Sequence, residues 1–335
     1  MPTKTLRILV TGSAGHLGEA LMRTLEGGAH EAIGLDVLPS EHTHRVGSIA
    51  ERDVVRACMA GVDVVLHAAT LHKPHVATHA RQTFVDTNVT GTLNLLEEAV
   101  AARVQAFVFT STTSTFGRAL VPPPGEPAAW ITEDVVPLPK NIYGATKVAA
   151  EDLCELIQRD SGMPCVVLRT SRFFPEGDDD ERSRELFDAD NLKVSEYLYR
   201  RVDIEDVVDA HLLAMHKAPQ IGFGRYIISA TTPFTRDDLG ELRSDAAAVV
   251  RRRVPAFEAE YARRGWSMVP TIDRVYINER ARRDLGWQPR HDCAAVIARL
   301  HGDSDFRSPL ARVVGSKGYH RQTPSPSAAR TATRP

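Results

Sequence analysis

Three glycines near the N-terminus, each three residues after the last, constrain the fold of this chain more than any other feature. They lie in the stretch Ile8-Leu9-Val10-Thr11-Gly12-Ser13-Ala14-Gly15-His16-Leu17-Gly18, which begins as an apolar run and continues as an amphipathic segment. The pattern predicts a strand, a tight turn at Gly12 and a helix that starts near Gly15. A glycine at position 15 lets a phosphate approach the backbone, and one at position 18 lets the helix lie close to the sheet. The helix N-terminus would then bind the pyrophosphate of a dinucleotide.

An acidic residue at the end of the next apolar run indicates which dinucleotide is bound. The run Ala32-Ile33-Gly34-Leu35 ends at Asp36. A carboxylate there can accept hydrogen bonds from the ribose hydroxyls and would repel a ribose 2′-phosphate. No arginine follows Asp36 until Arg45. The sequence therefore favours NAD over NADP as cofactor, although Asp36 could also be a turn residue at the end of a strand.

Strand-like and helix-like segments alternate from residue 6 to about residue 170. Alternation of this kind is typical of parallel strands joined by crossover helices, and strands buried on both faces have continuous apolar runs. We expect an α/β fold, a Rossmann-type doubly wound parallel sheet, with a smaller C-terminal substrate domain. The expected strands are Arg7–Thr11, Glu31–Leu35, Val62–His67, Ala106–Ser111 and Cys165–Arg169, and the clearest helices are Gly15–Glu26 and Val89–Ala102.

Length and composition exclude several other classes of protein. The chain has 335 residues, a formal net charge of -2 and 43% hydrophobic residues, which suffice for a core but point to no nucleic-acid partner. No apolar run is long enough to cross a membrane, and no secretory signal fits before the first strand. The four cysteines are scattered without metal-ligand spacing, so we expect free thiols, no metal site and a cytoplasmic protein with a small-molecule substrate.

A tyrosine and a lysine four positions apart carry the expected chemistry. In Tyr143-Gly144-Ala145-Thr146-Lys147 both side chains project from one face if the segment is helical. A free tyrosine has a pKa near about 10, which is too high for a base at neutral pH. A nearby ammonium group and an oxidised nicotinamide ring both favour phenolate. Thr112, at a predicted strand end, could orient the substrate oxygen, and Ser111 is the alternative.

These segments together resemble the extended short-chain dehydrogenases/reductases, the NAD-dependent epimerase/dehydratase family that includes UDP-glucose 4-epimerase. The matching segments follow the family's order and are Thr11–Gly18, Asp36, His67–Ala69, Asn88–Thr92, Val108–Gly117, Tyr143–Lys147 and Arg280–Pro289. The resemblance implies that Tyr143 is the acid/base, that Lys147 binds the nicotinamide ribose and that Thr112 orients the reacting oxygen. It also implies a homodimer.

The resemblance and the glycine turn together give the expected coenzyme site. The expected residues are Gly12, Gly15, His16, Leu17, Gly18, Asp36, His67, Ala68, Ala69, Asn88, Ser111, Tyr143, Lys147 and Arg169. For two of them a structural role is equally open: His67 as a hydrogen-bonded histidine at a strand end, and Asn88 as a capping or surface residue. We interpret His72 and His75, in the loop that follows, as solvated rather than as substrate contacts.

Departures from the family pattern bear on the substrate. The related 4,6-dehydratases carry an Asp-Glu pair after the strand-end threonine, where this chain has Thr113-Ser114, so dehydration is not expected. After Arg169 comes a short segment with an acidic run, Glu176–Asp190, which is unfavourable for a diphosphate. Arg200 or Arg201 could meet an anionic substrate or form structural salt bridges.

Three functions therefore stay open. The first is an NAD-dependent sugar or nucleotide-sugar epimerase/dehydrogenase that transfers hydride at a secondary alcohol. The second is a dehydrogenase of a small non-nucleotide alcohol, sugar or sugar acid, and the third is a non-catalytic NAD-binding regulator. We expect the dinucleotide domain to span 1–170 with 203–230 returning to it, the substrate domain 171–202 and 231–302, and a C-terminal tail 303–335 with a disordered end.

Overall fold

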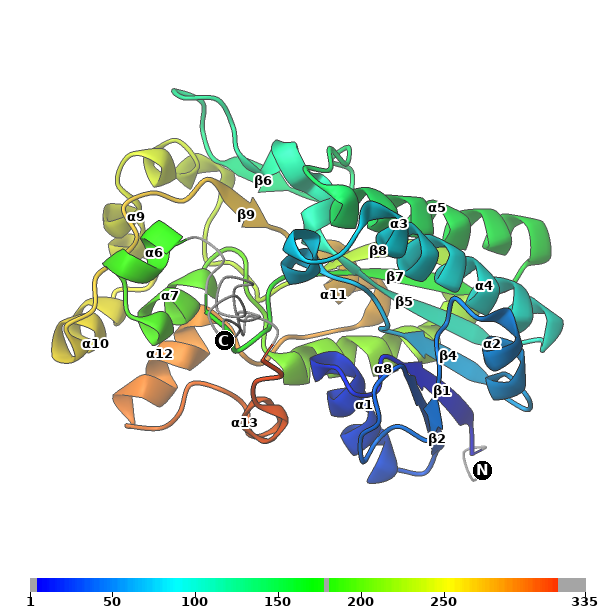
Figure 1. Cartoon of the computed structure of the whole chain (residues 1–335). Coiled ribbons are helices and arrows are strands. Elements are labelled where there is room, and N and C mark those ends of the chain that lie inside the picture. The colour runs from blue at the N-terminus through cyan, green and yellow to red at the C-terminus, as the bar shows by residue number, and fades with distance from the viewer. Residues whose placement is uncertain (1–4, 178–180, 319–335) are drawn as a thin grey trace, which may run out of the picture.

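The computed structural model describes residues 5–177 and 181–318, with the backbone alone at 181–182. Its largest element is a parallel sheet of seven strands in the order β3-β2-β1-β4-β5-β7-β8 (Figure 1). The strands are β1 (Arg7–Thr11), β2 (Glu31–Asp36), β3 (Arg45–Val46), β4 (Val64–His67), β5 (Ala106–Thr112), β7 (Cys165–Thr170) and β8 (Phe223–Ile228). The predicted fold class is therefore confirmed, and the predicted strands agree with the observed ones to within two residues at each end.

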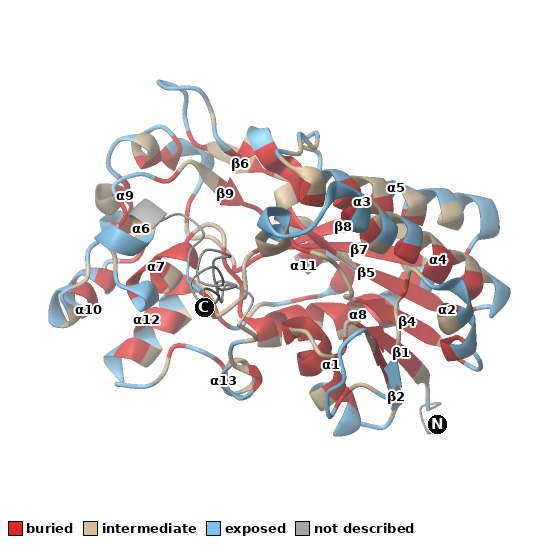
Figure 2. Cartoon of the chain, viewed as in Figure 1, coloured by how far each residue is buried: buried red, intermediate tan, exposed pale blue. Residues whose placement is uncertain are grey.

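Helices cover both faces of this sheet, as the continuous apolar strands predict. Because side chains alternate along a strand, Ile8 and Val10 pack into one core and Leu9 into the other. One face is covered by α1 (His16–Glu26), α8 (Ile204–Ile221), α11 (Glu279–Leu285) and α13 (Pro309–Val314). The other is covered by α2 (Arg52–Cys58), α4 (Gly91–Ala101) and α5 (Ile142–Ser161). Figure 2 shows the central strands β1, β4, β5 and β7 as largely buried.

A short π-helical segment, Val85–Thr90, replaces the start of the helix predicted from Val89. It follows the four-residue helix α3 (Arg81–Phe84) and leads into α4. Asn88 lies in this segment and is buried, so the irregular turn points its side chain into the molecule.

A second lobe has its own apolar core and a two-stranded parallel sheet of β6 (Ala129–Ile131) and β9 (Arg274–Tyr276). Its helices are α6 (Glu181–Leu186), α7 (Ala189–Glu196), α9 (Ala246–Arg253), α10 (Phe257–Arg264) and α12 (Cys293–His301). The segment 235–264 contains two short 3₁₀ turns, Arg236–Asp238 and Glu241–Arg243, followed by the helices α9 and α10. Gly240 and Pro255 lie at the interruptions, where each disfavours a continuous helix.

The segment after residue 303 is partly ordered against the sheet domain. Helix α13 begins after Ser308, whose hydroxyl accepts a hydrogen bond from the Ala311 amide, and Val314 is buried in the core below α1 and α8. The expected tail therefore contains a packed helix, because Val314 supplies an apolar anchor that periodicity alone does not reveal. The region predicted to be disordered, 321–335, lies outside the described residues. None of the helices in the described ranges combines the length and apolarity that crossing a membrane requires.

Candidate active site

The glycine turn has the geometry that the sequence predicts. Gly12 adopts a φ of +77°, and a Cβ there would lie 2.7 Å from the Ala69 backbone nitrogen. A Cβ on Gly18 would overlap the carbonyl oxygen of Gly12, so the helix packs directly on the turn. Helix α1 starts after Gly15 without a side-chain cap from the described residues. Its first amide groups are therefore free of intrahelical partners at the place where a phosphate would be bound.

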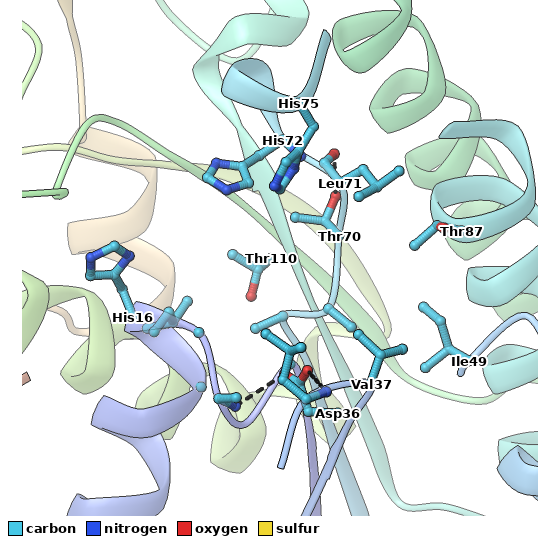
Figure 3. Close-up of a pocket in the computed structure, with 18 of the residues that line it drawn as sticks. His16, Asp36, Val37, Ile49, Thr70, Leu71, His72, His75, Thr87 and Thr110 are labelled. Carbon is cyan, nitrogen blue, oxygen red and sulfur yellow. Dashed lines mark hydrogen bonds between the residues drawn. The ribbon is translucent and has the colours of Figure 1, made fainter. Parts of the chain in front are cut away.

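Asp36 lies at the end of β2, beside this turn. Its carboxylate accepts hydrogen bonds from the amide of Ala14 at 3.0 Å and from that of Leu38 at 2.9 Å. Figure 3 shows Asp36 beside the turn, with Val37 and Ile49 nearby. The carboxylate thus holds the turn in place and also lines the adjoining cavity, where it can meet ribose hydroxyls.

A cavity of about 400 Å³ runs from Asp36 across the glycine turn to Tyr143. The predicted residues that line it are Gly12, Gly15, His16, Leu17, Gly18, Asp36, Ala68, Ala69, Ser111 and Tyr143. The small side chains after β4 and the helix N-terminus suit a flat, anionic molecule. An elongated cavity with a carboxylate at one end and a tyrosine at the other fits NAD.

His67 is not among the residues that line this cavity, which corrects the prediction that it contacts the coenzyme. Its Nδ1 lies 2.7 Å from the Thr11 hydroxyl and its Nε2 3.0 Å from the Thr92 hydroxyl. The Thr92 hydroxyl donates to the Asn88 carbonyl oxygen, so it accepts from Nε2. Burial, and secondarily the charge of Lys147, holds the pKa of His67 well below its usual value. His67 is thus a neutral, structural histidine.

Asn88 also supports the site, although it is not among the described residues that line the coenzyme cavity. Its carboxamide oxygen accepts from the Thr70 hydroxyl and the Leu71 amide, and its nitrogen donates to the Leu71 carbonyl oxygen and the Thr146 hydroxyl. The side chain therefore ties the loop after β4 to helix α5. This is a positioning role, and the alternative of a surface residue is wrong because Asn88 is buried.

Arg169 and Ser111 both bind Glu151 on α5. Arg169 Nη2 lies 2.7 Å from the Glu151 carboxylate, and the Ser111 hydroxyl donates to the same carboxylate at 2.5 Å. Arg225 reaches it at 3.2 Å. Arg169 lines neither of the two cavities described for this site, so its predicted coenzyme contact is corrected to a buried ion pair. Ser111 lines the coenzyme cavity, but its hydroxyl is already engaged.

Tyr143 and Lys147 lie one turn apart on α5, whose N-cap is Asn141. The Lys147 ammonium donates to the Thr110 carbonyl oxygen at 2.7 Å and lies 3.9 Å from the centre of the Phe109 ring. Burial lowers the pKa of Lys147 to about 7. Burial also raises the pKa of Tyr143 to about 12, against the smaller opposing effect of a hydrogen bond with Thr112. In this structure burial therefore raises the Tyr143 pKa, in the direction opposite to the lowering that the sequence predicts from the ammonium group.

A second pocket of about 270 Å³ opens on the other side of Tyr143. Thr112 lines it, together with Thr113 and Ser114 from the turn after β5. Residues that line both cavities mark where coenzyme and substrate would meet, and these are His72, Tyr143, Thr170, Phe173 and Phe174. The structure thus brings the predicted base and the predicted orienting hydroxyl to one junction.

The interpretation of His72 and His75 as solvated loop residues is wrong. His72 is buried and lines both cavities, and His75 lines the coenzyme cavity (Figure 3). Phe174 lies between two of the histidines, with ring centres 5.5 Å from His72 and 5.3 Å from His16. The rings of His16, His72 and Phe174 come from segments that are far apart in the sequence. No local sequence pattern therefore predicts that they meet at the cavity wall.

For Arg200 and Arg201 the sequence leaves both a substrate contact and a structural salt bridge open, and the structure gives the two arginines different positions. Arg201 is buried, with its Nε 2.8 Å from Glu196 and its Nη1 3.1 Å from the Phe174 carbonyl oxygen. Arg200 lines the second pocket and lies 2.7 Å from Glu196. Arg201 is therefore structural, whereas Arg200 is placed to contact a substrate. Residues 178–180 of the acidic run lie outside the described residues.

Comparison with known proteins agrees with this geometry. The family model described as the NAD dependent epimerase/dehydratase family matches residues 8–228. The chain belongs to this family. The match includes the glycine turn, Asp36 and the Tyr143–Lys147 pair, and NAD, the coenzyme that the sequence predicts, is the one the family description names.

Curated relatives span several activities within the family. A UDP-glucose 4-epimerase of Rhizobium meliloti is 28% identical over 324 residues, covering 86% of this chain and 94% of its own. A 3 beta-hydroxysteroid dehydrogenase/Delta 5-->4-isomerase of Mycobacterium tuberculosis is 26% identical over 332 residues, covering 86% and 88%. These relatives are enzymes and they differ in substrate. Sequence similarity alone therefore does not identify the substrate of this chain.

Solved structures support the fold. A short-chain dehydrogenase/reductase superfamily protein from Agrobacterium tumefaciens with bound NAD has a TM-score of 0.62 at 24% identity, covering 92% of this chain and 99% of that one. The UDP-glucose 4-epimerase of Thermotoga maritima with UDP-glucose has a TM-score of 0.60 at 21% identity, covering 89% and 99%. The two-lobed architecture is therefore that of the family.

Proposed function

We propose that this family member is an NAD-dependent epimerase or dehydrogenase that acts on a secondary alcohol of a sugar-type substrate, with Tyr143 as acid/base. The observation that carries the proposal is the position of Tyr143, whose side chain lines both the coenzyme cavity and the polar pocket next to it. A group at that junction can exchange a proton with a substrate while the carbon next to it faces the coenzyme.

The roles of the surrounding residues follow from their contacts. Tyr143 takes the hydroxyl proton of the substrate as the C–H bond breaks, and it returns a proton when a carbonyl is reduced. Thr112, whose hydroxyl contacts the phenol, holds the reacting oxygen. When bound, NAD supplies the acceptor for the hydride that leaves the same carbon. A carbonyl product that stays bound and is reduced from its other face gives epimerisation, and one that departs gives net dehydrogenation.

The charge at the site favours the phenolate once the coenzyme is present. Burial, opposed by the hydrogen bond with Thr112, raises the pKa of Tyr143 to about 12. The oxidised nicotinamide ring is cationic, and a cation in the adjoining cavity lowers the pKa of a phenol. The buried Lys147 acts in the same direction when it is protonated. Lys147 is not among the described residues that line either cavity, and its ammonium donates to the Thr110 carbonyl oxygen. We propose that it favours the phenolate from this position and binds the coenzyme ribose when its side chain turns from Thr110 toward the cavity.

The lining of the second pocket favours a sugar over a steroid. Hydroxyl and amide side chains on it include Thr112, Thr113, Ser114, Asn141 and Ser171. Such groups can hydrogen-bond a polyhydroxylated ligand. An apolar ligand would leave the Ser171 hydroxyl, which is buried without a partner among the described residues, unsatisfied at a cost of about 1–3 kcal/mol. The activity of the hydroxysteroid relatives is therefore not proposed here.

The test is a Tyr143→Phe variant assayed with NAD against a panel of sugars, sugar acids and nucleotide sugars. We expect turnover to fall by about 10²–10⁴-fold, the usual contribution of a general acid/base, while NAD affinity stays within a few-fold. Tyr226→Phe is the control, since Tyr226 is buried in β8 and lines neither cavity. Full turnover by Tyr143→Phe would refute the assigned role. NAD binding without turnover of any substrate by the wild-type protein would favour a non-catalytic regulator.

A further inference from the structure

The second pocket carries a concentration of basic side chains. Its basic residues are Lys73, Lys140, Arg172, Arg200 and Arg274, and none of the described residues lining it is an aspartate or glutamate. A neutral sugar needs hydrogen-bond partners but gains nothing from cations. An excess of cations in a partly enclosed pocket favours an anionic ligand.

Two of the arginines share one carboxylate. Glu196 lies 2.7 Å from Arg200 and 4.0 Å from Arg172, and it also binds the buried Arg201 at 2.8 Å. One negative charge thus faces three guanidinium groups. The aspartates at 178–180 lie outside the described residues. Arg172 and Arg200 are therefore not assigned to a ligand.

Ser171 and Arg274 present polar atoms that have no protein partner in the part of the chain that the structure describes. The Ser171 hydroxyl oxygen and the Arg274 Nε are both buried without a hydrogen bond, and Ser171 is only 3% exposed. A buried polar atom left unsatisfied costs about 1–3 kcal/mol, so a ligand that supplies the missing partner is favoured. Both side chains line the second pocket, which makes the substrate the natural partner.

Arg274 is also held on a rigid element. It is the first residue of β9, where it pairs in register with Ala129 of β6. Its neighbour Asp273 is fixed by an ion pair with Arg243. A guanidinium group held by a strand can bind a carboxylate or a phosphate in a defined orientation, because its donors form a planar fork.

The size of the pocket limits the ligand. The pocket measures about 270 Å³, whereas the coenzyme cavity measures about 400 Å³. A nucleotide sugar carries a base, a ribose, a diphosphate and a second sugar, and is close to a dinucleotide in size. A single sugar with one anionic group is much smaller and matches the lesser volume.

We propose that Arg274 and Ser171 form an anion subsite, and that the substrate is an anionic single sugar, bearing a carboxylate or a phosphate. This inference rests on the proposed function, since the subsite is part of the pocket in which Tyr143 reacts. Arg274 binds the anionic group through its guanidinium, and the Ser171 hydroxyl donates to the same group or to an adjacent oxygen. The subsite then orients the reacting carbinol toward Tyr143.

The experiment measures binding rather than turnover, so that it stands apart from the test of the acid/base. The NAD-loaded full-length protein is titrated calorimetrically with hexuronic acids, hexonic acids and hexose phosphates, with the neutral hexoses, and with UDP-glucose. We expect at least one acid or phosphate to bind tenfold or more tightly than its neutral parent. The sugar acids and the sugar phosphates are titrated as separate series. The series that contains the tighter-binding ligand identifies the anionic group.

Variants then assign the effect to the subsite. Arg274→Gln is expected to weaken binding of the anionic sugar at least tenfold, Arg274→Lys to restore part of it, and Ser171→Ala to weaken it by a smaller factor. Arg159→Gln, at a surface position on α5, is the matched control and should change nothing. The proposal is overturned if no anionic single sugar binds more tightly than its neutral parent, if only UDP-glucose binds, or if folded Arg274→Gln binds the acids as wild type does. In each of these cases the role of Tyr143 is still judged by Tyr143→Phe.

Discussion

Glu176 contacts His16 across the coenzyme cavity wall, with 3.1 Å between the carboxylate Oε1 and the imidazole Nε2. His16 is the first residue of α1, and Glu176 lies in the segment that follows β7. The same carboxylate oxygen accepts hydrogen bonds from the Ser316 hydroxyl at 2.9 Å and from the Lys317 amide at 3.0 Å. The C-terminal part of the described chain is therefore joined to the glycine-turn helix and to the segment containing Phe174.

This contact predicts a specific loss of stability in acid. Burial raises the pKa of Glu176, but the hydrogen bond and charge of His16 and the hydrogen bond from Ser316 more than compensate and hold it at about 2. Because the folded-state pKa lies below the ordinary 4.5, the stabilisation is present above pH 4.5 and is lost as the pH falls toward 2. It amounts to about 3 kcal/mol when complete.

The measurement is urea unfolding of wild type and Glu176→Gln between pH 2 and pH 7. We expect the variant to be less stable at neutral pH and the difference to shrink as the pH falls below 4.5. Glu126→Gln, at an exposed position, serves as control and should follow the wild type. A difference that is the same at every pH would mean that the ionised carboxylate does not stabilise the fold.

The two hydroxyls at the end of β5 predict different outcomes when each is removed. Thr112→Ala removes the hydroxyl that contacts Tyr143 and should lower kcat by about 10²-fold. The same hydroxyl accepts a hydrogen bond from the Ser114 amide at 3.1 Å and caps the turn after β5, so a loss of about 1 kcal/mol of stability is expected as well. Ser111→Ala removes the donor to Glu151 and should cost about 1.5–3 kcal/mol of stability, as a hydrogen bond to a charged group does, while leaving most of kcat. Steady-state kinetics and thermal unfolding of both variants decide between them. A larger kcat loss in Ser111→Ala would return the orienting role to Ser111.

The sheet and the coenzyme turn were predictable from sequence because both depend on local patterns. The apolar runs of β1, β4 and β5 are buried on both faces. The tight turn after β1 requires a positive φ at Gly12, and glycine is the residue that adopts it readily. It was harder to predict which residues at the strand ends line the coenzyme cavity. His67 and Ala68 are neighbours, yet only Ala68 lines the coenzyme cavity, because the His67 ring is held between the Thr11 and Thr92 hydroxyls.

Contacts between distant segments escaped the sequence analysis. The three-residue strands β6 and β9 are too short for a periodic signal, and they pair across more than a hundred residues. The resemblance predicts a coenzyme contact for Arg169, but its partner in the structure is Glu151 on the preceding helix. Phe174 reaches the cavity wall only because its loop folds back over α1. Such contacts depend on how the elements pack, which a single sequence does not specify.

Asp36 predicts how the coenzyme preference can be changed. Asp36→Ala removes the acceptor for ribose hydroxyls and the charge that repels a 2′-phosphate, so NAD should bind about ten- to a hundredfold more weakly. NADP should lose less or gain, because the repulsion is gone. Calorimetric dissociation constants for both coenzymes give the ratio. Since the carboxylate also accepts from the amides of Ala14 and Leu38, a small loss of thermal stability is expected as well. An unchanged NAD/NADP ratio would show that Asp36 serves the turn alone.

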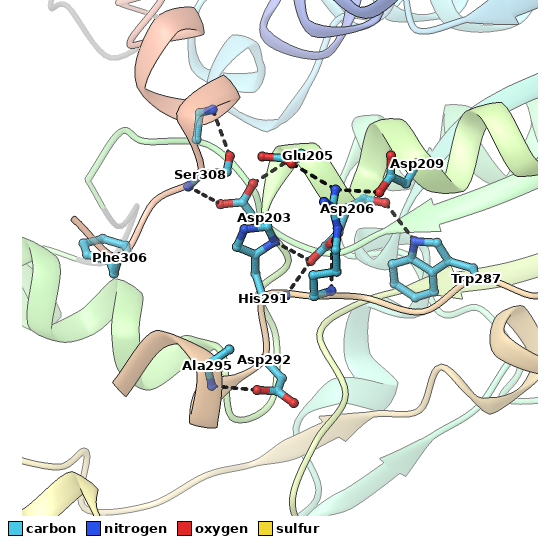
Figure 4. Close-up of polar contacts among 12 residues, drawn as sticks. Asp203, Glu205, Asp206, Asp209, Trp287, His291, Asp292, Ala295, Phe306 and Ser308 are labelled. Atoms are coloured by element: carbon cyan, nitrogen blue, oxygen red, sulfur yellow. Dashed lines mark hydrogen bonds and ion pairs between the residues drawn. The ribbon is translucent and has the colours of Figure 1, made fainter. Parts of the chain in front are cut away.

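A buried carboxylate on α8 joins the last part of the second lobe to the sheet domain. Asp206 is fully buried and accepts hydrogen bonds from the amides of Arg290 and His291 and from the His291 Nδ1 (Figure 4). Its own carbonyl oxygen accepts from the Trp287 indole at 2.9 Å. Burial lowers the pKa of His291, but the hydrogen bond with Asp206 and the charges of Asp203 and Asp206 outweigh it, so the pKa is raised overall.

Asp206→Asn should therefore destabilise the protein, and by an amount that depends on pH. The histidine is protonated more readily in the folded state, so its stabilisation is present below its ordinary pKa of 6.5 and is lost as the pH rises through the raised value. We expect a loss of about 3–5 kcal/mol at pH 6, where the charged pair is broken, and a smaller loss at pH 9. Asp209→Asn is the matched control, because Asp209 is 40% exposed and binds Arg290 at the surface, where an ion pair contributes about 0–1 kcal/mol. Denaturant unfolding at the two pH values provides the comparison. An Asp206→Asn loss as small as that of Asp209→Asn would mean that the backbone amides, and not the charged pair, hold this junction together.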